Sequence, residues 1–246
     1  MVRPSPGSDL TAAPRRFYAP RNFTTLQQCG PPVSVQLMTE HSSRWLSTRV
    51  AGVILAGGRN SRMGGRDKAY LRVDGETVLS RTLSVLRRCF PEVVVVSNTP
   101  EKYAEFAVEV IADELRDCGP LGGLHAALGR ISTPYAFVTA CDMPFLHIEP
   151  IRYLVACLRD QDAIVPRWDG DIEPLHALYA ARLRGPIAAA VAGGARAMRE
   201  FLPQIAVEYV PQAAMERVAG ATEAFRNVNT PEDAARFAVQ VAGEQH

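Results

Sequence analysis

The sequence lacks the features by which several classes of protein are recognised. None of its apolar runs approaches the roughly 18 residues of a membrane-spanning helix, and its N-terminus lacks the apolar core of a secretory signal. Lys and Arg (27) almost balance Asp and Glu (26), so no global basic field suggests binding to nucleic acid or a membrane surface. The five cysteines include no CxxC or other metal-ligand spacing. These absences predict a cytoplasmic protein with reduced thiols, in which any anion site is local.

Sustained apolar periodicity is also missing from the first 49 residues. This segment contains six prolines and six arginines but only two acidic residues. Such a composition cannot bury enough apolar surface to fold, so residues 1–49 are predicted to be a disordered leader. Two alternatives remain open. The Arg-rich, acid-poor composition also suits a transit peptide, and a start codon assigned too early fits Met38, which lies just ahead of the first apolar run.

From residue 50 onward, short apolar runs alternate with amphipathic stretches. The β-rich runs cover residues 50–55, 93–97, 108–112, 135–140, 162–166 and 207–211. Helical patterns cover residues 76–90, 122–131, 149–160, 185–193 and 231–242. Strands that alternate with helices favour right-handed crossovers and a sheet covered on both faces. The sequence therefore predicts a single doubly wound α/β domain over residues 50–246, with a mostly parallel sheet and helices on both faces.

A glycine-rich basic stretch, LAGGRNSRMGGRDK, covers residues 55–68 directly after the first predicted strand. Ligands of doubly wound sheets bind beyond the carboxyl ends of the strands. Gly57 and Gly58 can bring backbone N–H groups close to a ligand. Positive charge is supplied by Arg59, Arg62, Arg66 and Lys68. The stretch matches neither the P-loop nor the GxGxxG pattern. It favours polyphosphate binding, and a glycine-rich turn with a solvated basic rim is the alternative.

Polar residues follow three of the other predicted strands. Asn98, Asp113 and Asp142 come at the ends of the runs that begin at residues 93, 108 and 135. We expect them to share one rim of the sheet. Asp142, beside the basic stretch, is a candidate ligand for Mg²⁺, which is usually held by one or two carboxylates and by substrate phosphates. Without further context, Asn98 could be a turn residue, Asp113 a helix cap and Asp142 a surface turn residue.

Several short motifs then follow one another in a distinctive order and spacing. They are LAGGRNSRMGGRDK, SN at 97–98, AD at 112–113, GPLGG at 119–123, CDMP at 141–144, EPLHALY at 173–179 and NVNTPED at 227–233. Jointly they resemble the molybdenum cofactor guanylyltransferase family, part of a superfamily of nucleotidyltransferases with a Rossmann-like fold. The resemblance covers nearly everything after Val50. It implies transfer of GMP from GTP to the terminal phosphate of molybdopterin, with release of pyrophosphate and Mg²⁺ as the cofactor.

The resemblance also implies which residues bind. With the basic stretch it assigns the nucleotide to Leu55, Ala56, Gly57, Gly58, Lys68, Asn98, Asp113 and Asp142. Asp142 would hold Mg²⁺, and Asn229 matches a second metal-binding position at which relatives often carry Asp. Transfer between two phosphates requires charge neutralisation and alignment. Arg62 and Lys68, with Asp142, are therefore the candidate catalytic residues. No protein nucleophile is needed, because the acceptor phosphate is already ionised at neutral pH.

Other functions on the same fold remain open at this point. They are a cytidylyltransferase, a sugar-phosphate nucleotidyltransferase and a non-catalytic nucleotide sensor. The motif GPLGG is expected to be a loop that closes around the base, or else a simple helix-entry turn, and His176 in EPLHALY is a weaker candidate for an acceptor contact. The expected partners are GTP, molybdopterin and molybdoenzyme-maturation proteins, with neither nucleic acid nor membrane.

Overall fold

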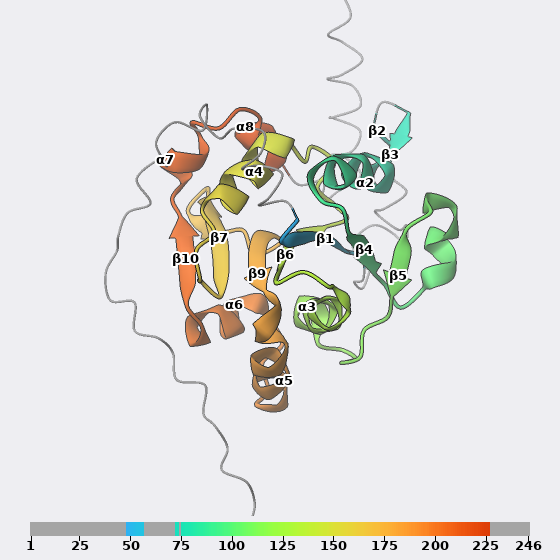
Figure 1. Cartoon of the computed structure of the whole chain (residues 1–246), viewed down its shortest axis with the longest axis vertical. Helices are drawn as coiled ribbons and strands as arrows, with labels where there is room; N and C mark the ends of the chain where they lie inside the picture. Colours follow the sequence, from blue (N-terminus) through green and yellow to red (C-terminus); the bar gives the residue numbers. More distant parts are fainter. Residues whose placement is uncertain (1–47, 57–71, 74, 227–246) are drawn as a thin grey trace, which may run out of the picture.

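The computed structural model describes residues 48–56, 72–73 and 75–226 (Figure 1). Its main sheet has the strand order β10-β7-β9-β6-β1-β4-β5, with β8 paired to β7. The strands are β1 (Val50–Leu55), β4 (Val93–Val96), β5 (Glu109–Ile111), β6 (Tyr135–Ala140), β7 (Ala163–Trp168), β8 (Asp171–Ile172), β9 (His176–Ala180) and β10 (Val207–Val210). Separately, β2 (Arg72–Val73) pairs with β3 (Glu76–Thr77). The predicted strands from residue 50 onward are thus present, with ends that differ by no more than two residues.

Most neighbouring strands of the main sheet are parallel. β1 pairs in parallel with both β4 and β6, so that Leu55 lies beside Val96 on one side and Ala140 on the other. β5 is parallel to β4, and β10 is parallel to β7. β9 is antiparallel to both of its neighbours, β6 and β7. The carboxyl ends of β1, β4, β5, β6 and β7 therefore share one edge of the sheet, which confirms the mostly parallel architecture.

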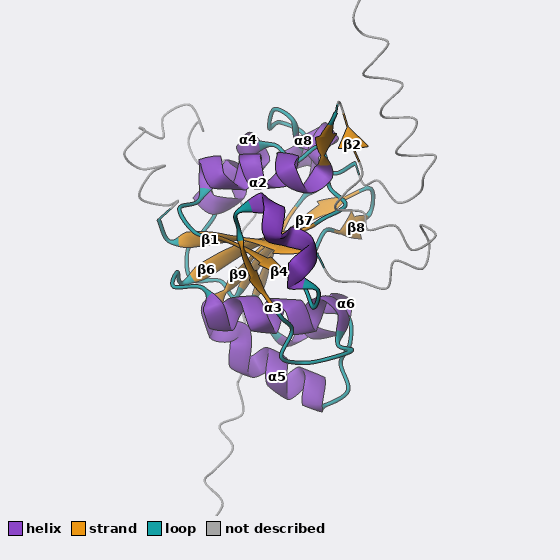
Figure 2. Ribbon diagram, turned by 90° about the vertical axis from the view of Figure 1, so that its right-hand side faces the viewer, coloured by secondary structure: helices purple, strands orange, loops and turns teal. Residues whose placement is uncertain are grey.

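Helices cover both faces of the sheet. The α-helices are α2 (Val78–Cys89), α3 (Gly119–Arg130), α4 (Ile148–Ala156), α5 (Arg184–Ala192), α6 (Met198–Phe201), α7 (Gln212–Met215) and α8 (Ala221–Ala224). Short 3-10 helices are η4 (Pro100–Phe106), η5 (Ala181–Leu183) and η6 (Leu202–Gln204). Figure 2 shows α2, α4 and α8 on one side of the sheet and α3, α5 and α6 on the other. The doubly wound α/β fold is confirmed. None of the helices in the described ranges is long and apolar enough to span a membrane.

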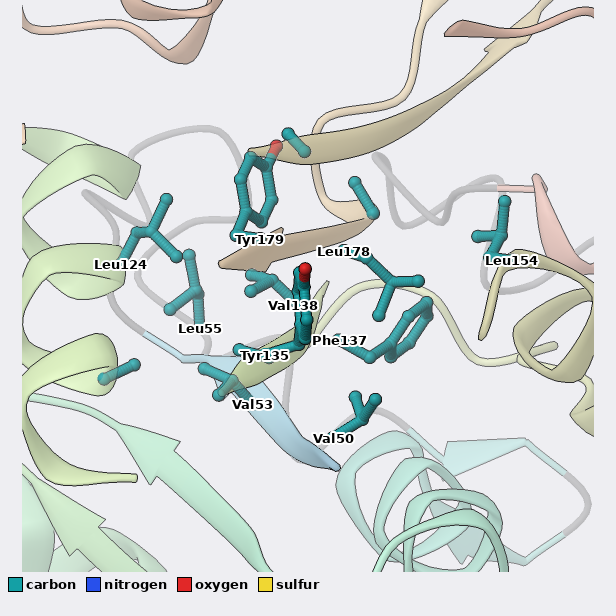
Figure 3. Close-up of a cluster of buried hydrophobic side chains, with 14 of the residues drawn as sticks. Val50, Val53, Leu55, Leu124, Tyr135, Phe137, Val138, Leu154, Leu178 and Tyr179 are labelled. Carbon is teal, nitrogen blue, oxygen red and sulfur yellow. The ribbon is translucent and has the colours of Figure 1, made fainter. Parts of the chain in front are cut away.

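The core is built around β1 and β6, and every residue of both strands is buried (Figure 3). Because helices cover both faces, side chains that alternate between the faces are all removed from water, which explains the continuous apolar runs. Burial of one large aliphatic side chain contributes roughly 1.5–3 kcal/mol. The core therefore holds the ends of these two strands rigidly in register, and the candidate site lies beyond those ends.

The motif GPLGG lies inside a helix, because α3 begins at Gly119. The expectation of a loop around the base was therefore wrong. Pro120 is tolerated in the first turn, where a backbone N–H has no partner within the helix. A Cβ at Gly122 would lie 2.5 Å from the carbonyl oxygen of Leu115, and one at Gly123 would lie 3.1 Å from Leu55 Cδ2. The two glycines thus let α3 pack directly against β1 and the segment before the helix.

Candidate active site

A cavity of about 140 Å³ lies at the carboxyl ends of the parallel strands. Its lining residues from the strand ends are Leu55, Val96, Ala140, Cys141 and Asp142. Asp113 follows β5, Gly119, Pro120 and Gly123 belong to the start of α3, and Leu175 precedes β9. This is the position at which the fold class binds its ligands. The cavity therefore unites the ends of four parallel strands with a helix N-terminus.

A larger cavity of about 700 Å³ lies between α5 and α6. Three alanines and two glycines form half of its wall, and among the described residues that line it only Glu200 is charged. A wall whose charged group is a carboxylate does not suit a phosphate. The smaller cavity, which contains the predicted carboxylates, is therefore the candidate active site.

Five of the predicted nucleotide residues lie in the described part of the chain, and the structure brings them together. Leu55, Asp113 and Asp142 line the cavity itself. Ala56 is buried beside it, donates its N–H to Val96 O at 2.9 Å and accepts the Tyr103 hydroxyl at 3.1 Å. Asn98 is exposed, and its Oδ1 accepts the backbone N–H of Asp113 at 2.9 Å. The residues thus share one rim, as the strand ends predicted.

The other predicted site residues lie outside the described residues. These are Gly57, Gly58, Arg62, Lys68 and Asn229. β1 ends at Leu55, at the edge of the cavity, so the glycine-rich stretch continues directly from the wall of the site. The contributions expected from these residues stay predictions.

Asp113 presents an unusual carboxyl group. Its Oδ1 is buried and has no hydrogen-bond partner among the described residues. Burial raises the pKa of this carboxyl above its ordinary value, while hydrogen bonding with the Asn98 side chain acts in the opposite direction. The same oxygen lies 3.4 Å from the position of a Cβ at Gly123. A buried acceptor without a partner is costly, so Asp113 is suited to accept a hydrogen bond from a donor on a ligand.

Glu173 lies two residues before Leu175, which lines the cavity, and its carboxyl group is perturbed. The pKa of Glu173 is raised to about 7, mainly by burial and also by the charges of Asp171, Asp169 and Asp142, while Arg199 acts in the opposite direction. The described ranges contain no group of three or more His, Cys, Asp or Glu residues arranged to hold a metal ion. Mg²⁺ does not require such a cage, since substrate phosphates and water complete its oxygen shell. Asp142, at the end of β6 and facing the cavity, fits this manner of binding.

His176 is a core residue. It has no exposed surface, and its ring lies edge-on to Phe137 and tilted against Phe225, at centroid distances of 5.1 and 4.7 Å. Its position in the structure therefore does not support the acceptor contact considered from the sequence.

Sequence reasoning assigned no binding to several residues that line the cavity. They are Val96, Ala140, Cys141 and Leu175, of which Cys141 and Leu175 lie within the motifs CDMP and EPLHALY. Gly119, Pro120 and Gly123 also line the cavity, and they belong to GPLGG, the motif expected to close around the base. The motifs therefore carried a signal, but only the packing of α3 and of the segment before β9 shows which of their residues face the cavity.

Comparison with known proteins gives a consistent result. The family model described as the MobA-like NTP transferase domain matches residues 52–209. A molybdenum cofactor guanylyltransferase from Syntrophotalea carbinolica is 36% identical over 195 residues, which cover 78% of this chain and 92% of the relative. One from Desulfosudis oleivorans is 31% identical over 185 residues, which cover 75% of this chain and 92% of the relative.

Solved structures agree with this. The crystal structure of molybdopterin-guanine dinucleotide biosynthesis protein A from Archaeoglobus fulgidus superposes with a TM-score of 0.68 at 26% identity, and covers 78% of this chain and 98% of that chain. A 2-C-methyl-D-erythritol 4-phosphate cytidylyltransferase from Thermus thermophilus, with a TM-score of 0.56 at 19% identity, covers 77% and 98% and shares the fold.

Proposed function

The chain belongs to the MobA-like NTP transferase family, and on that basis we propose that it is a molybdenum cofactor guanylyltransferase. It transfers GMP from GTP to the terminal phosphate of molybdopterin and releases pyrophosphate, so that the guanine dinucleotide form of the cofactor results. One structural observation supports this most directly. Asp113 and Asp142, which were selected from the sequence as nucleoside and metal ligands, line the same cavity at the strand ends.

Asp113 and the start of α3 form the nucleoside side of the site. The buried Oδ1 of Asp113 accepts a hydrogen bond from the nucleoside, and Leu55 and Gly123 form the adjacent wall. Asn98 contributes by holding the backbone of Asp113. A smaller base would leave buried polar groups of the site without hydrogen-bond partners, and each such group costs about 1–3 kcal/mol. The site should therefore discriminate against a smaller base.

Asp142 lies on the phosphate side. There it would hold Mg²⁺, with Asn229 as a further candidate ligand, and the metal would supply positive charge for neutralisation of the phosphates. Lys68 and Arg62 of the glycine-rich stretch stabilise the charge that builds up on the α-phosphoryl group and the departing pyrophosphate. An oxygen of the acceptor phosphate attacks the α-phosphorus, and the bond from that phosphorus to the pyrophosphate oxygen breaks. No proton transfer by a protein base is required.

The decisive experiment is a pyrophosphate-release assay with purified protein and Mg²⁺. GTP, CTP, ATP and UTP are each supplied with and without molybdopterin. Release should require molybdopterin and should favour GTP by at least about a hundredfold in kcat/KM, which corresponds to roughly 2.7 kcal/mol. Equal use of CTP would overturn the guanylyl assignment and leave nucleotide transfer standing. Cytoplasmic location and contact with molybdoenzyme-maturation proteins belong to the same proposal.

A further inference from the structure

Glu114, the residue after Asp113, connects the segment between β5 and α3 to two helices. Arg184, at the start of α5, donates from Nη2 to both carboxylate oxygens of Glu114, at 2.9 and 3.2 Å. Nδ1 of the buried His125, in α3, lies 3.5 Å from Glu114 Oε2 but has no hydrogen bond among the described residues. A residue directly beside the cavity is therefore bonded to Arg184, whose side chain lies outside the cavity.

Arg184 is packed against α3. A Cβ at Gly129 would lie 2.7 Å from both Cζ and Nε of Arg184. The guanidinium therefore occupies the space that a side chain at position 129 would take. Glycine at that position allows the guanidinium to lie over the helix while it reaches the carboxylate of Glu114.

The residues on either side of Glu114 are held as well. The backbone N–H of Asp113 donates to Asn98 Oδ1 at 2.9 Å. The carbonyl of Leu115 packs against α3, where a Cβ at Gly122 would approach it to 2.5 Å. Three successive residues are thus held by three elements: Asp113 by the segment after β4, Glu114 by α5 and Leu115 by α3. The side-chain contact of Glu114 with Arg184 is the part of this arrangement that a substitution can remove without touching the cavity wall.

The pair contributes little to overall stability. Arg184 and Glu114 are 45% and 54% exposed, and exposed ion pairs contribute roughly 0.2–1 kcal/mol. Its main effect is therefore local. If residues 113–115 leave their binding-competent conformation in part of the molecules, the apparent affinity for the nucleotide falls in proportion to the fraction that remains competent.

We propose that Arg184 and Glu114 are positioning residues for the nucleotide, because their ion pair holds the 113–115 segment so that the Asp113 carboxyl faces the cavity. This inference rests on the proposed function in one respect, namely that Asp113 contacts the nucleoside. Asp113 binds the substrate in the ground state and the transition state alike, so loss of its position raises KM and leaves kcat unchanged.

The test compares Arg184→Ala and Glu114→Gln with a matched control, Arg130→Ala. Arg130, the last residue of α3, makes an exposed two-bond pair with Glu109 at 2.5 and 2.6 Å, but neither residue lines the cavity. Both test variants should raise KM for GTP about two- to fivefold, the most that an exposed pair of this strength provides, with kcat unchanged and Tm within a few degrees of the wild type. The control should leave all three values unchanged. The double variant Arg184→Glu with Glu114→Arg should recover at least part of the loss in KM.

GTP binding is also measured by titration calorimetry, without molybdopterin. If the wild type binds GTP but releases no pyrophosphate, the proposed transfer fails, and the affinities of the variants still decide the inference. If the wild type transfers GMP and Arg184→Ala keeps the wild-type KM and affinity, the inference alone fails. It fails equally if Arg130→Ala raises KM as much as Arg184→Ala does.

Discussion

His176 offers a quantitative test of the structure through the dependence of stability on pH. The ring is fully buried in β9 beside Phe137 and Phe225, and neither of its nitrogens has a hydrogen-bond partner among the described residues. A proton on this ring would place a charge in an apolar environment without compensation. Burial therefore lowers the pKa of His176 from 6.5 to about 3.

The sign and size of the effect follow from linkage. Below pH 6.5 the unfolded chain takes up a proton at this position, while the folded protein stays neutral there until about pH 3. The unfolded state binds more protons, so the free energy of unfolding falls as the pH falls, by about 1.4 kcal/mol per pH unit within this window. The loss from His176 is only about 0.2 kcal/mol at pH 7 and reaches about 2 kcal/mol at pH 5.

Replacement of the ring by a group that does not titrate should remove this dependence. Urea unfolding at pH 7 and pH 5 is measured for the wild type, for His176→Leu and for His147→Leu, which removes an exposed histidine instead. Between the two pH values, the stability of His176→Leu relative to the wild type should rise by about 2 kcal/mol. Contributions from carboxylates cancel in this difference. The reasoning is refuted if His176→Leu and the wild type lose the same free energy of unfolding on acidification.

The remaining predictions concern the site. Gly123→Ala should raise KM for GTP with little loss of Tm, because the added methyl group meets the flexible Leu55 side chain at 3.1 Å. Gly122→Ala should lower Tm, because its methyl group meets a backbone carbonyl at 2.5 Å. Equal Tm values for the two variants would contradict this. Asp142→Ala should abolish transfer, weaken Mg²⁺-dependent GTP binding and leave the circular dichroism spectrum unchanged, and normal turnover at saturating Mg²⁺ would exclude Asp142 as the metal ligand. Lys68→Ala should reduce kcat on the order of 10²–10³, about 3–4 kcal/mol, with a smaller effect on GTP affinity; a loss confined to affinity would make Lys68 a ground-state binding residue. Removal of residues 1–45 should leave both transfer and Tm unchanged, and a large fall in Tm would show that these residues join the core.

The strands β1 and β6 could be predicted because the apolar residues of each, which the structure buries, are consecutive in the sequence. Residues 50–55 and 135–140 are continuous apolar runs, and the structure makes each of them a strand with the predicted bounds. β9 was not predicted as a strand, although all its residues are buried. A short, fully buried strand has the same apolar composition as a short buried helix, so composition alone did not identify β9 as a strand. Its pairing partners lie in other parts of the chain, about 40 residues earlier in β6 and shortly before it in β7.

The candidate site divides in the same way. Asp113 and Asp142 were recognisable because each follows an apolar run, and carboxyl ends of parallel strands meet at one edge of a sheet. The sequence could not show that Asp113 Oδ1 is buried without a hydrogen-bond partner among the described residues, or that Gly123 leaves room beside it. Nor could it show that Arg184 reaches Glu114 from α5. Strand formation depends on the pattern of neighbouring residues, and so the sequence alone determined the alternation of strands and helices and the positions of the carboxylates after the strands. Cavities and ion pairs depend on contacts between segments far apart in the chain, and these were decided only when the helices packed on the sheet.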